Sequence, residues 1–287
     1  MQNKIILGTV QLGLDYGINN QNGKPSRDEA FDILNIAKQH GIKTLDTAQA
    51  YGDAIDIIGE FNKENKPFHI ITKFAFPEHL DIEEYFNSLI QKLNIDTLEA
   101  VLFHRFSELT AHSETVKALS KLKQKKLINK IGVSVYTNEE LLLAAGIDEI
   151  DLIQFPFNLL DNYSLRYAGI QKAVQQKKTI HVRSVFLQGL FFMSVNNLPE
   201  LLKPLKPYLD MLHQIASAQN ISVNELALKY VLQTDEIDGV LIGVESAEQL
   251  KTNISLLNKE PLNQSVIERI NSIHVPSTEL LNPVNWK

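Results

Sequence analysis

The sequence has no cysteine among its 287 residues. Disulfide bonds, thiolate metal sites and cysteine nucleophiles are therefore excluded, and a reducing compartment is the expected location. The sequence also lacks any apolar run near the roughly 18 residues that a transmembrane helix needs, and its first apolar stretch is too short for a signal peptide. We expect a cytoplasmic protein that does not associate with a membrane.

Positive charge is scarcer than negative charge. Lys and Arg number 28 against 34 Asp and Glu, which gives a net charge of -6. This balance argues against broad binding to nucleic acid or to an acidic membrane surface. The histidines are scattered, no H-E-x-x-H motif occurs and no carboxylates cluster, so we predict no metal site.

The sequence does contain eight short apolar segments that alternate with helix-like segments. The predicted strands are residues 5–8, 42–46, 69–73, 100–104, 130–134, 151–154, 179–183 and 240–243. The predicted helices are residues 27–40, 54–64, 82–93, 114–126, 139–145, 165–177, 208–219, 223–232, 247–257 and 265–273. Continuous apolarity is typical of buried parallel strands. The pattern predicts the α/β class and a closed (β/α)₈ TIM barrel in which residues 1–287 form a single domain. We expect an insertion between the seventh and eighth strands, and a C-terminal helix and tail.

Three ionisable residues each end a predicted strand: Asp46, Lys73 and His104. In a (β/α)₈ barrel the carboxyl ends of the strands carry the chemistry, so these side chains should converge there. Tyr51, in the loop after Asp46, can reach the same place. An ammonium beside a tyrosine lowers the pKa of its hydroxyl, which then donates a proton to a carbonyl oxygen. Taken singly, these residues also fit a buried ion pair, a surface aromatic and a core histidine.

At these positions the sequence resembles the aldo-keto reductase superfamily, over nearly the whole chain. Residues 45–52 (Leu-Asp-Thr-Ala-Gln-Ala-Tyr-Gly) are similar to the aspartate–tyrosine motif of that family, and residues 71–73 and 102–104 to its lysine and histidine strands. The resemblance implies that Asp46, Tyr51, Lys73 and His104 form a catalytic tetrad. It further implies NAD(P)H-dependent reduction of an aldehyde or ketone, possibly sugar-like, to an alcohol, with hydride from the nicotinamide and the proton from Tyr51.

The resemblance also implies an NADP or NAD site without a Rossmann fold, and no G-x-G-x-x-G motif follows a predicted strand. The residues that it assigns to the cofactor are Gly8, Thr9, Val10, Asp46, Ser134, Gln154, Arg183, Ser184, Leu187, Gly189, Gly243, Glu245, Ser246, Gln249 and Asn253. Here Val135 stands where the family often has asparagine. Arg183 stands where an aromatic residue often stacks on the nicotinamide, so it either stacks there or turns toward an acid, with Phe186 as a substitute.

Members of this family that prefer NADPH usually place Lys or Arg near positions 243 and 249, where the 2′-phosphate binds. In this sequence neither Gly243 nor Gln249 is basic, and Glu245 is acidic. We therefore expect weak discrimination between the cofactors, with NADH usable. The loops at residues 13–24, 155–163 and 191–207, with the Trp286 tail, are predicted to shape a pocket for a small-molecule carbonyl substrate.

Two other functions stay open. Lys73 can act as the nucleophile of a Schiff-base aldolase, and the chain can be a cofactor-sensing regulatory module with weak turnover. The sequence names neither the substrate nor the oligomeric state.

Overall fold

The computed structural model describes every residue except 1–2, 19, 21–22, 65, 76–80 and 287. Its strands are β1 (Ile5–Gly8), β2 (Thr44–Ala48), β3 (His69–Phe74), β4 (Leu98–Phe103), β5 (Ile128–Ser134), β6 (Leu152–Pro156), β7 (Thr179–Arg183) and β8 (Gly239–Gly243). Each strand pairs in parallel with the next, and β8 pairs with β1, so the sheet closes into a barrel. The predicted (β/α)₈ fold is confirmed.

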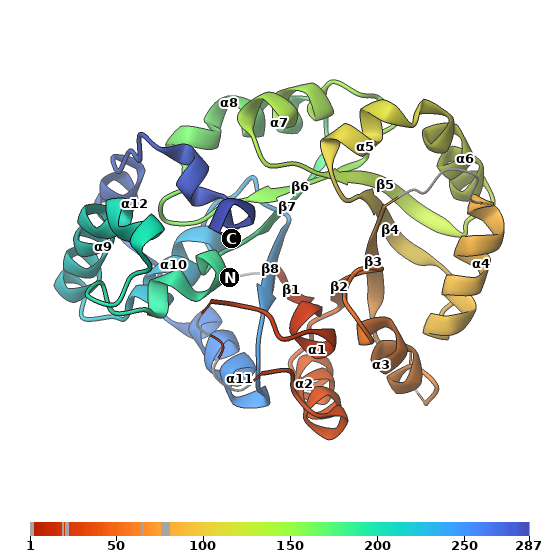
Figure 1. Ribbon diagram of the computed structural model, residues 1–287, viewed down its shortest axis with the longest axis horizontal. Coiled ribbons are helices and arrows are strands. Elements are labelled where there is room, and N and C mark those ends of the chain that lie inside the picture. The colour runs from red at the N-terminus through yellow and green to blue at the C-terminus, as the bar shows by residue number, and fades with distance from the viewer. Residues whose placement is uncertain (1–2, 19, 21–22, 65, 76–80, 287) are drawn as a thin grey trace.

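The helices lie outside the ring of strands, as Figure 1 shows. The longer ones are α2 (Arg27–Gln39), α3 (Ala54–Phe61), α4 (Ile82–Leu93), α6 (Ser113–Gln124), α7 (Asn138–Ala145), α8 (Tyr163–Gln175), α9 (Lys206–Ala218), α10 (Val223–Leu232), α11 (Ala247–Ser255) and α12 (Gln264–Asn271). The short ones are α1 (Val10–Gly13), α5 (Phe106–Ala111), η1 (Leu187–Phe192), η2 (Glu200–Leu205), η3 (Leu256–Asn258), η4 (Thr278–Leu281) and η5 (Pro283–Trp286). No helix of the described chain is long and apolar enough to span a bilayer.

The predicted insertion lies between β7 and β8 and consists of η1, η2, α9 and α10. In Figure 1, α9, α10 and α12 lie together on one side of the barrel, next to the C-terminal segment. Local signals explain where several helices begin. Ser26 and Glu29 form a capping box at the start of α2, and Thr137 and Glu140 form another at the start of α7. Each box satisfies two backbone N–H groups that the helix leaves unpaired.

Four predicted strand ends are wrong: β3 ends at Phe74 and not at 73, β4 at Phe103 and not at 104, β6 at Pro156 and not at 154, and β2 also differs. The sequence placed the end of the second strand at Asp46, but β2 runs on to Ala48, which pairs with Lys73 of β3. Thr47 and Ala48 are fully buried, so the ladder continues through a residue that the apolar pattern did not include. Since side chains of a strand point alternately to its two faces, Asp46 still shares a face with Ala48.

Candidate active site

The site is a cavity of about 750 Å³ at the carboxyl ends of the barrel strands. Its wall includes Gly8, Lys73, Ser134, Arg183 and Gly243, each the last or next-to-last residue of its strand. A volume of this size is typical of cofactor and substrate sites. The four predicted tetrad residues line the cavity, as do the predicted cofactor residues with one exception. Leu187 is fully buried in the core, so its side chain does not line the wall.

Asp46 and Lys73 form a buried ion pair at the base of the cavity. Lys73 Nζ donates to Asp46 Oδ1, and both side chains are at most 3% exposed. Gln154 Nε2 donates to the other carboxylate oxygen at 2.9 Å. Burial acts to lower the pKa of Lys73, but the charge of Asp46 and the neighbouring Tyr51 outweigh it, and the pKa of Lys73 is raised. The lysine is therefore a charged group, which disfavours its use as a Schiff-base nucleophile.

Tyr51 lies in the loop between β2 and α3, with its ring centre 5.4 Å from Lys73 Nζ. The backbone holds this loop tightly: Gly52 has a φ of +54°, and a methyl group added to Gly13 would lie 1.8 Å from the carbonyl oxygen of Tyr51. Burial raises the pKa of the Tyr51 hydroxyl more than Lys73 lowers it. The expected lowering of this pKa is therefore wrong, because desolvation penalises the phenolate before any ligand binds.

His104 follows β4 directly, and its side chain is partly buried in the cavity wall. Burial, helped by the charges of Lys73 and Arg183, lowers its pKa to about 4. The imidazole is therefore neutral near pH 7, with one N–H group for donation. Such a group can orient a carbonyl oxygen.

Gln154 also has a free buried acceptor. Its Oε1 atom lacks a hydrogen-bond partner among the described residues, and so does Oε1 of Gln11, another residue of the cavity wall. A buried carbonyl oxygen without a donor is unfavourable, and a bound amide would supply one. The absence of a side chain at Gly243 makes room for the Gln11 amide, because an added Cβ would lie 2.3 Å from Gln11 Oε1. These features fit a nicotinamide dinucleotide.

Arg183 does not turn toward an acid. Its Nε donates to Ser134 Oγ at 3.3 Å, and its Nη2 donates to the Val135 carbonyl oxygen at 3.3 Å. The guanidinium lies over the Tyr136 ring, 4.2 Å from its centre. No carboxylate in the described chain forms an ion pair with Arg183, so the alternative of a structural salt bridge does not hold there.

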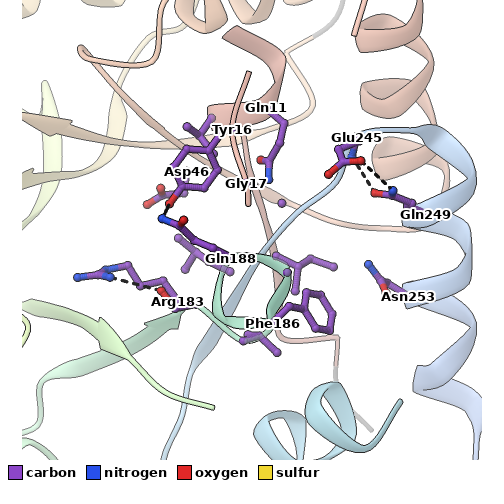
Figure 2. A pocket seen from close by; sticks show the side chains of 18 of the residues that line it. Gln11, Tyr16, Gly17, Asp46, Arg183, Phe186, Gln188, Glu245, Gln249 and Asn253 are labelled. Atoms are coloured by element: carbon purple, nitrogen blue, oxygen red, sulfur yellow. Dashed lines mark hydrogen bonds between the residues drawn. The ribbon is translucent and has the colours of Figure 1, made fainter. Parts of the chain in front are cut away.

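The loop after β7 carries a cluster of unusual backbone angles. Ser184, Leu187 and Gln188 have φ values of 62°, 47° and 53°, in the left-handed region that non-glycine residues rarely adopt. Gln188 Nε2 donates to the Tyr16 hydroxyl at 2.8 Å, and the backbone N–H of Ile18 donates to the Gln188 carbonyl oxygen at 3.2 Å. These bonds join the β1 loop to the β7 loop over the cavity, as Figure 2 shows for Tyr16 and Gln188.

The far end of the cavity lies beside α11. Ser246 accepts a hydrogen bond from the Gln249 N–H and caps the start of the helix, while the Gln249 side-chain oxygen accepts from the N–H of Glu245 at 2.9 Å. The basic residue in this wall is Lys259, which pairs with Glu225 at 2.7 Å. Lys251 instead pairs weakly with Glu248 and does not line the cavity.

The sequence predicted the substrate loops only in part. Tyr16, Gly17, Asn20 and Phe192 of the predicted loops line the cavity, but no residue of 155–163 does, and neither does Trp286. Residues 19 and 21–22 of the first loop lie outside the described residues. Aromatic side chains of residues 155–163 pack in the core instead. Phe157, for example, stacks on Tyr230 with a centroid separation of 5.6 Å. The wall residues that sequence reasoning missed include Gln11, Tyr136, Gln188, Ser222, Asn224, Glu225, Glu248, Thr252, Ser255, Leu256 and Lys259. They belong to no motif, because their role comes from the closure of the barrel. The described residues hold no group of three metal-ligating side chains.

A (β/α)₈ barrel with a lysine–aspartate pair, a tyrosine and a neutral histidine around a dinucleotide-sized cavity has the form of a barrel oxidoreductase. The family model for the aldo/keto reductase family matches residues 4–275, and the chain belongs to that family. It is therefore an NAD(P)H-dependent oxidoreductase, and carbonyl reduction is the activity of this family.

The chain is similar to several characterised proteins. It is 23% identical to the NADH-specific methylglyoxal reductase of Escherichia coli, over 88% of this chain and 89% of that protein. It is 24% identical to L-galactose dehydrogenase of Arabidopsis thaliana, over 91% and 89% of the two chains. The structure of aldo-keto reductase AKR11C1 from Bacillus halodurans superposes with a TM-score of 0.75 at 21% identity, covering 96% and 93%. That structural likeness supports the fold.

Proposed function

We propose that this protein reduces an aldehyde or ketone to an alcohol, and that Tyr51 donates the proton. The observation that carries the proposal is the meeting of Tyr51, Lys73, Asp46 and His104 in one cavity wall. When bound, a reduced nicotinamide supplies the hydride. The protein supplies the proton and orients the carbonyl group.

Tyr51 is suited to be the acid because its raised pKa keeps the hydroxyl protonated at neutral pH. Donation leaves a phenolate close to the Lys73 ammonium, which stabilises the negative charge as it forms. Asp46 holds that ammonium charged and in place through their ion pair. The neutral His104 can donate a second hydrogen bond to the same carbonyl oxygen, which fixes the reacting geometry.

The cofactor residues are proposed on the same basis. Ser134 and Gln154 would hold the carboxamide, with Gln154 Oε1 as an acceptor that is otherwise unsatisfied. The strained β7 loop and Gly189 would pass over the pyrophosphate. The backbone N–H groups that begin α11 would meet a phosphate or the adenosine end.

We propose that NADH is an effective cofactor. Glu225, Glu245 and Glu248 all line the cavity, and the basic residue of that end, Lys259, already pairs with Glu225. Lys229 also pairs with Glu225 at 2.8 Å, and Lys251 lies 3.8 Å from Glu248, so the lysines of this end are matched by carboxylates. A second phosphate on the adenosine ribose would therefore meet no surplus of positive charge there. The NADH-specific relative in Escherichia coli is consistent with this choice.

A carbonyl screen tests the activity directly. Aldehydes, keto-sugars and 2-oxo acids are each incubated with enzyme and NADH or NADPH, and loss of reduced-cofactor absorbance is followed together with alcohol formation. We expect turnover of at least one class in step with cofactor oxidation. Tight cofactor binding without turnover on any carbonyl compound would contradict the proposal and favour a cofactor-sensing role.

A further inference from the structure

Arg183 is a cation in the cavity wall that contacts only uncharged acceptors. Besides Ser134 and Val135 at 3.3 Å, its Nη1 donates to Ser184 Oγ at 3.5 Å. All three distances lie beyond the usual range of about 2.7–3.2 Å for N–H···O bonds. Arg183 is therefore held in place without an ion pair to any described residue, since Asp161, on whose pKa its charge acts, pairs with Arg166 instead.

Other cations in or near the cavity are neutralised. Lys73 pairs with Asp46, and the buried Lys229 pairs with Glu225 at 2.8 Å. Arg166 makes two bonds of 2.6 Å to Asp161. A charge that loses hydration without a counter-ion is unfavourable, so a purely structural arginine would be expected to have such a partner.

The geometry leaves a fork of donors free. A guanidinium has five N–H groups, and the contacts to Ser134, Ser184 and Val135 use one on each nitrogen. One N–H group therefore remains on each of Nη1 and Nη2. Stacking on Tyr136 fixes the plane of the guanidinium. Two N–H groups held in a fixed plane can donate to the oxygens of a carboxylate or phosphate.

The position of Arg183 points to the substrate end of the cavity. Figure 2 shows Glu245, Gln249 and Asn253 at the end of the cavity beside α11, and Arg183 at the opposite end. Its charge also helps to lower the pKa of His104, although burial and the charge of Lys73 have larger effects. The guanidinium therefore lies near the groups proposed to hold the carbonyl.

We propose that the substrate is a carbonyl compound that carries an oxyanion, a carboxylate or phosphate, bound by the free fork of Arg183. This inference rests on the proposed carbonyl reduction and names its substrate class. A bound oxyanion would also remove the penalty that an unpaired guanidinium imposes on the positive charge of oxidised nicotinamide.

Matched substrate pairs test the proposal. 4-Formylbenzoate is compared with its methyl ester, and glyceraldehyde 3-phosphate with glyceraldehyde, in the presence of saturating NADH. The ratio of kcat/KM for the anionic and neutral members is measured in the wild type, Arg183→Met and Arg183→Lys. Arg269→Met makes the same exchange on the exposed face of α12 and serves as the control.

We expect the wild type to favour at least one anionic member, and Arg183→Met to reduce that ratio about ten- to a hundredfold, the size of one charge-assisted bond. Arg183→Lys should keep part of the preference, and Arg269→Met all of it. The substrate pair that responds separates a carboxylate from a phosphate. A ratio that Arg183→Met leaves unchanged for both pairs would overturn the proposal.

Two binding measurements separate this inference from the proposed activity. Calorimetric titration of the NADH complex with benzoate and with inorganic phosphate needs no turnover, and we expect Arg183→Met to weaken the binding of one anion at least tenfold. That loss would support the oxyanion site even if no carbonyl compound were reduced. If Arg183→Met instead weakens NADH binding more than tenfold and leaves anion binding unchanged, Arg183 serves the cofactor and the proposal is wrong.

Discussion

Gly13 and Tyr51 approach so closely that no side chain fits between them: a methyl group on Gly13 would lie 1.8 Å from the Tyr51 carbonyl oxygen and 2.8 Å from the Ala54 nitrogen. The contact joins α1 to the loop that carries the proposed proton donor. Backbone atoms form both sides, so neither can yield by changing a rotamer. The position of Tyr51 therefore depends on the absence of a Cβ atom in another element.

Gly13→Ala should displace the Tyr51 loop and lower kcat. A misplacement of about 1 Å can reduce a rate about a hundredfold, so we expect a loss of roughly ten- to a hundredfold with the far-ultraviolet circular dichroism unchanged. Gly146→Ala is the matched control, since Gly146 has a φ of -85° and its nearest neighbour is the flexible end of Lys172 at 3.3 Å. Wild-type turnover in Gly13→Ala would show that the loop adapts freely.

Tyr51→Phe should abolish carbonyl reduction while leaving NADH affinity nearly intact. The substitution removes the hydroxyl and keeps the ring, and general acid catalysis is typically worth about 10²–10⁴-fold. Steady-state kinetics measure the first effect and fluorescence titration the second. Near-normal turnover would remove Tyr51 from the mechanism.

Lys73→Met should both inactivate and destabilise the protein. It leaves the Asp46 carboxylate buried without a counter-ion, which typically costs about 3–5 kcal/mol, and it removes the charge that opposes the raised pKa of Tyr51. Urea unfolding and initial rates measure the two effects. The double variant Asp46→Asn, Lys73→Met should recover part of the unfolding free energy without recovering activity, because no unpaired charge remains. Recovery of activity in that variant would refute the role of the ammonium.

Glu245→Gln should shift cofactor choice toward NADPH. Glu245 is half-buried in the cavity wall near the end assigned to adenosine, and removing one like charge from a second phosphate is worth about 1–2 kcal/mol, or roughly five- to thirtyfold in relative affinity. Titration of the wild type with both cofactors should show NADPH favoured by less than about a hundredfold. Glu260→Gln, on an exposed residue outside the wall, is the control. A stronger wild-type preference for NADPH would mean that another basic group reaches the adenosine end.

His181 should make the fold sensitive to acid. It is 8% exposed, its Nδ1 lacks a partner among the described residues, and burial lowers its pKa to about 3. An unfolded histidine titrates near 6.5, so below that pH the unfolded state binds the extra proton and stability falls as pH falls toward 3. This single histidine should therefore lower the free energy of unfolding by about 2–3 kcal/mol at pH 4.5 relative to pH 7.

Urea unfolding at pH 7 and pH 4.5 measures this dependence. The difference between the two pH values should shrink in His181→Gln and persist in His213→Gln, which changes an exposed histidine on α9. An equal difference in all three proteins would place the acid sensitivity elsewhere.

The sequence by itself determined the barrel and which ionisable groups lie at the carboxyl ends of its strands. Eight apolar segments separated by capped helices can bury their surface only by pairing in parallel. That pairing brings Asp46, Lys73 and His104 to one end, because all eight strands run the same way. Even the misplaced end of β2 left Asp46 in the cavity wall, since the side-chain alternation of a strand does not depend on where the ladder stops.

Only the tertiary structure decided how these groups behave. Burial from several elements raises the pKa of Tyr51 although Lys73 is near, and desolvation of this kind has no signature in local sequence. Arg183 contacts Ser134, Val135 and Tyr136, residues that the chain brings to it from β5 and the loop that follows. Lys259 likewise pairs with Glu225, and Gly13 packs against Tyr51, although both partners are far away in the sequence. Motifs record which residues are present, whereas charge balance and close contact depend on which surfaces the closed barrel places together.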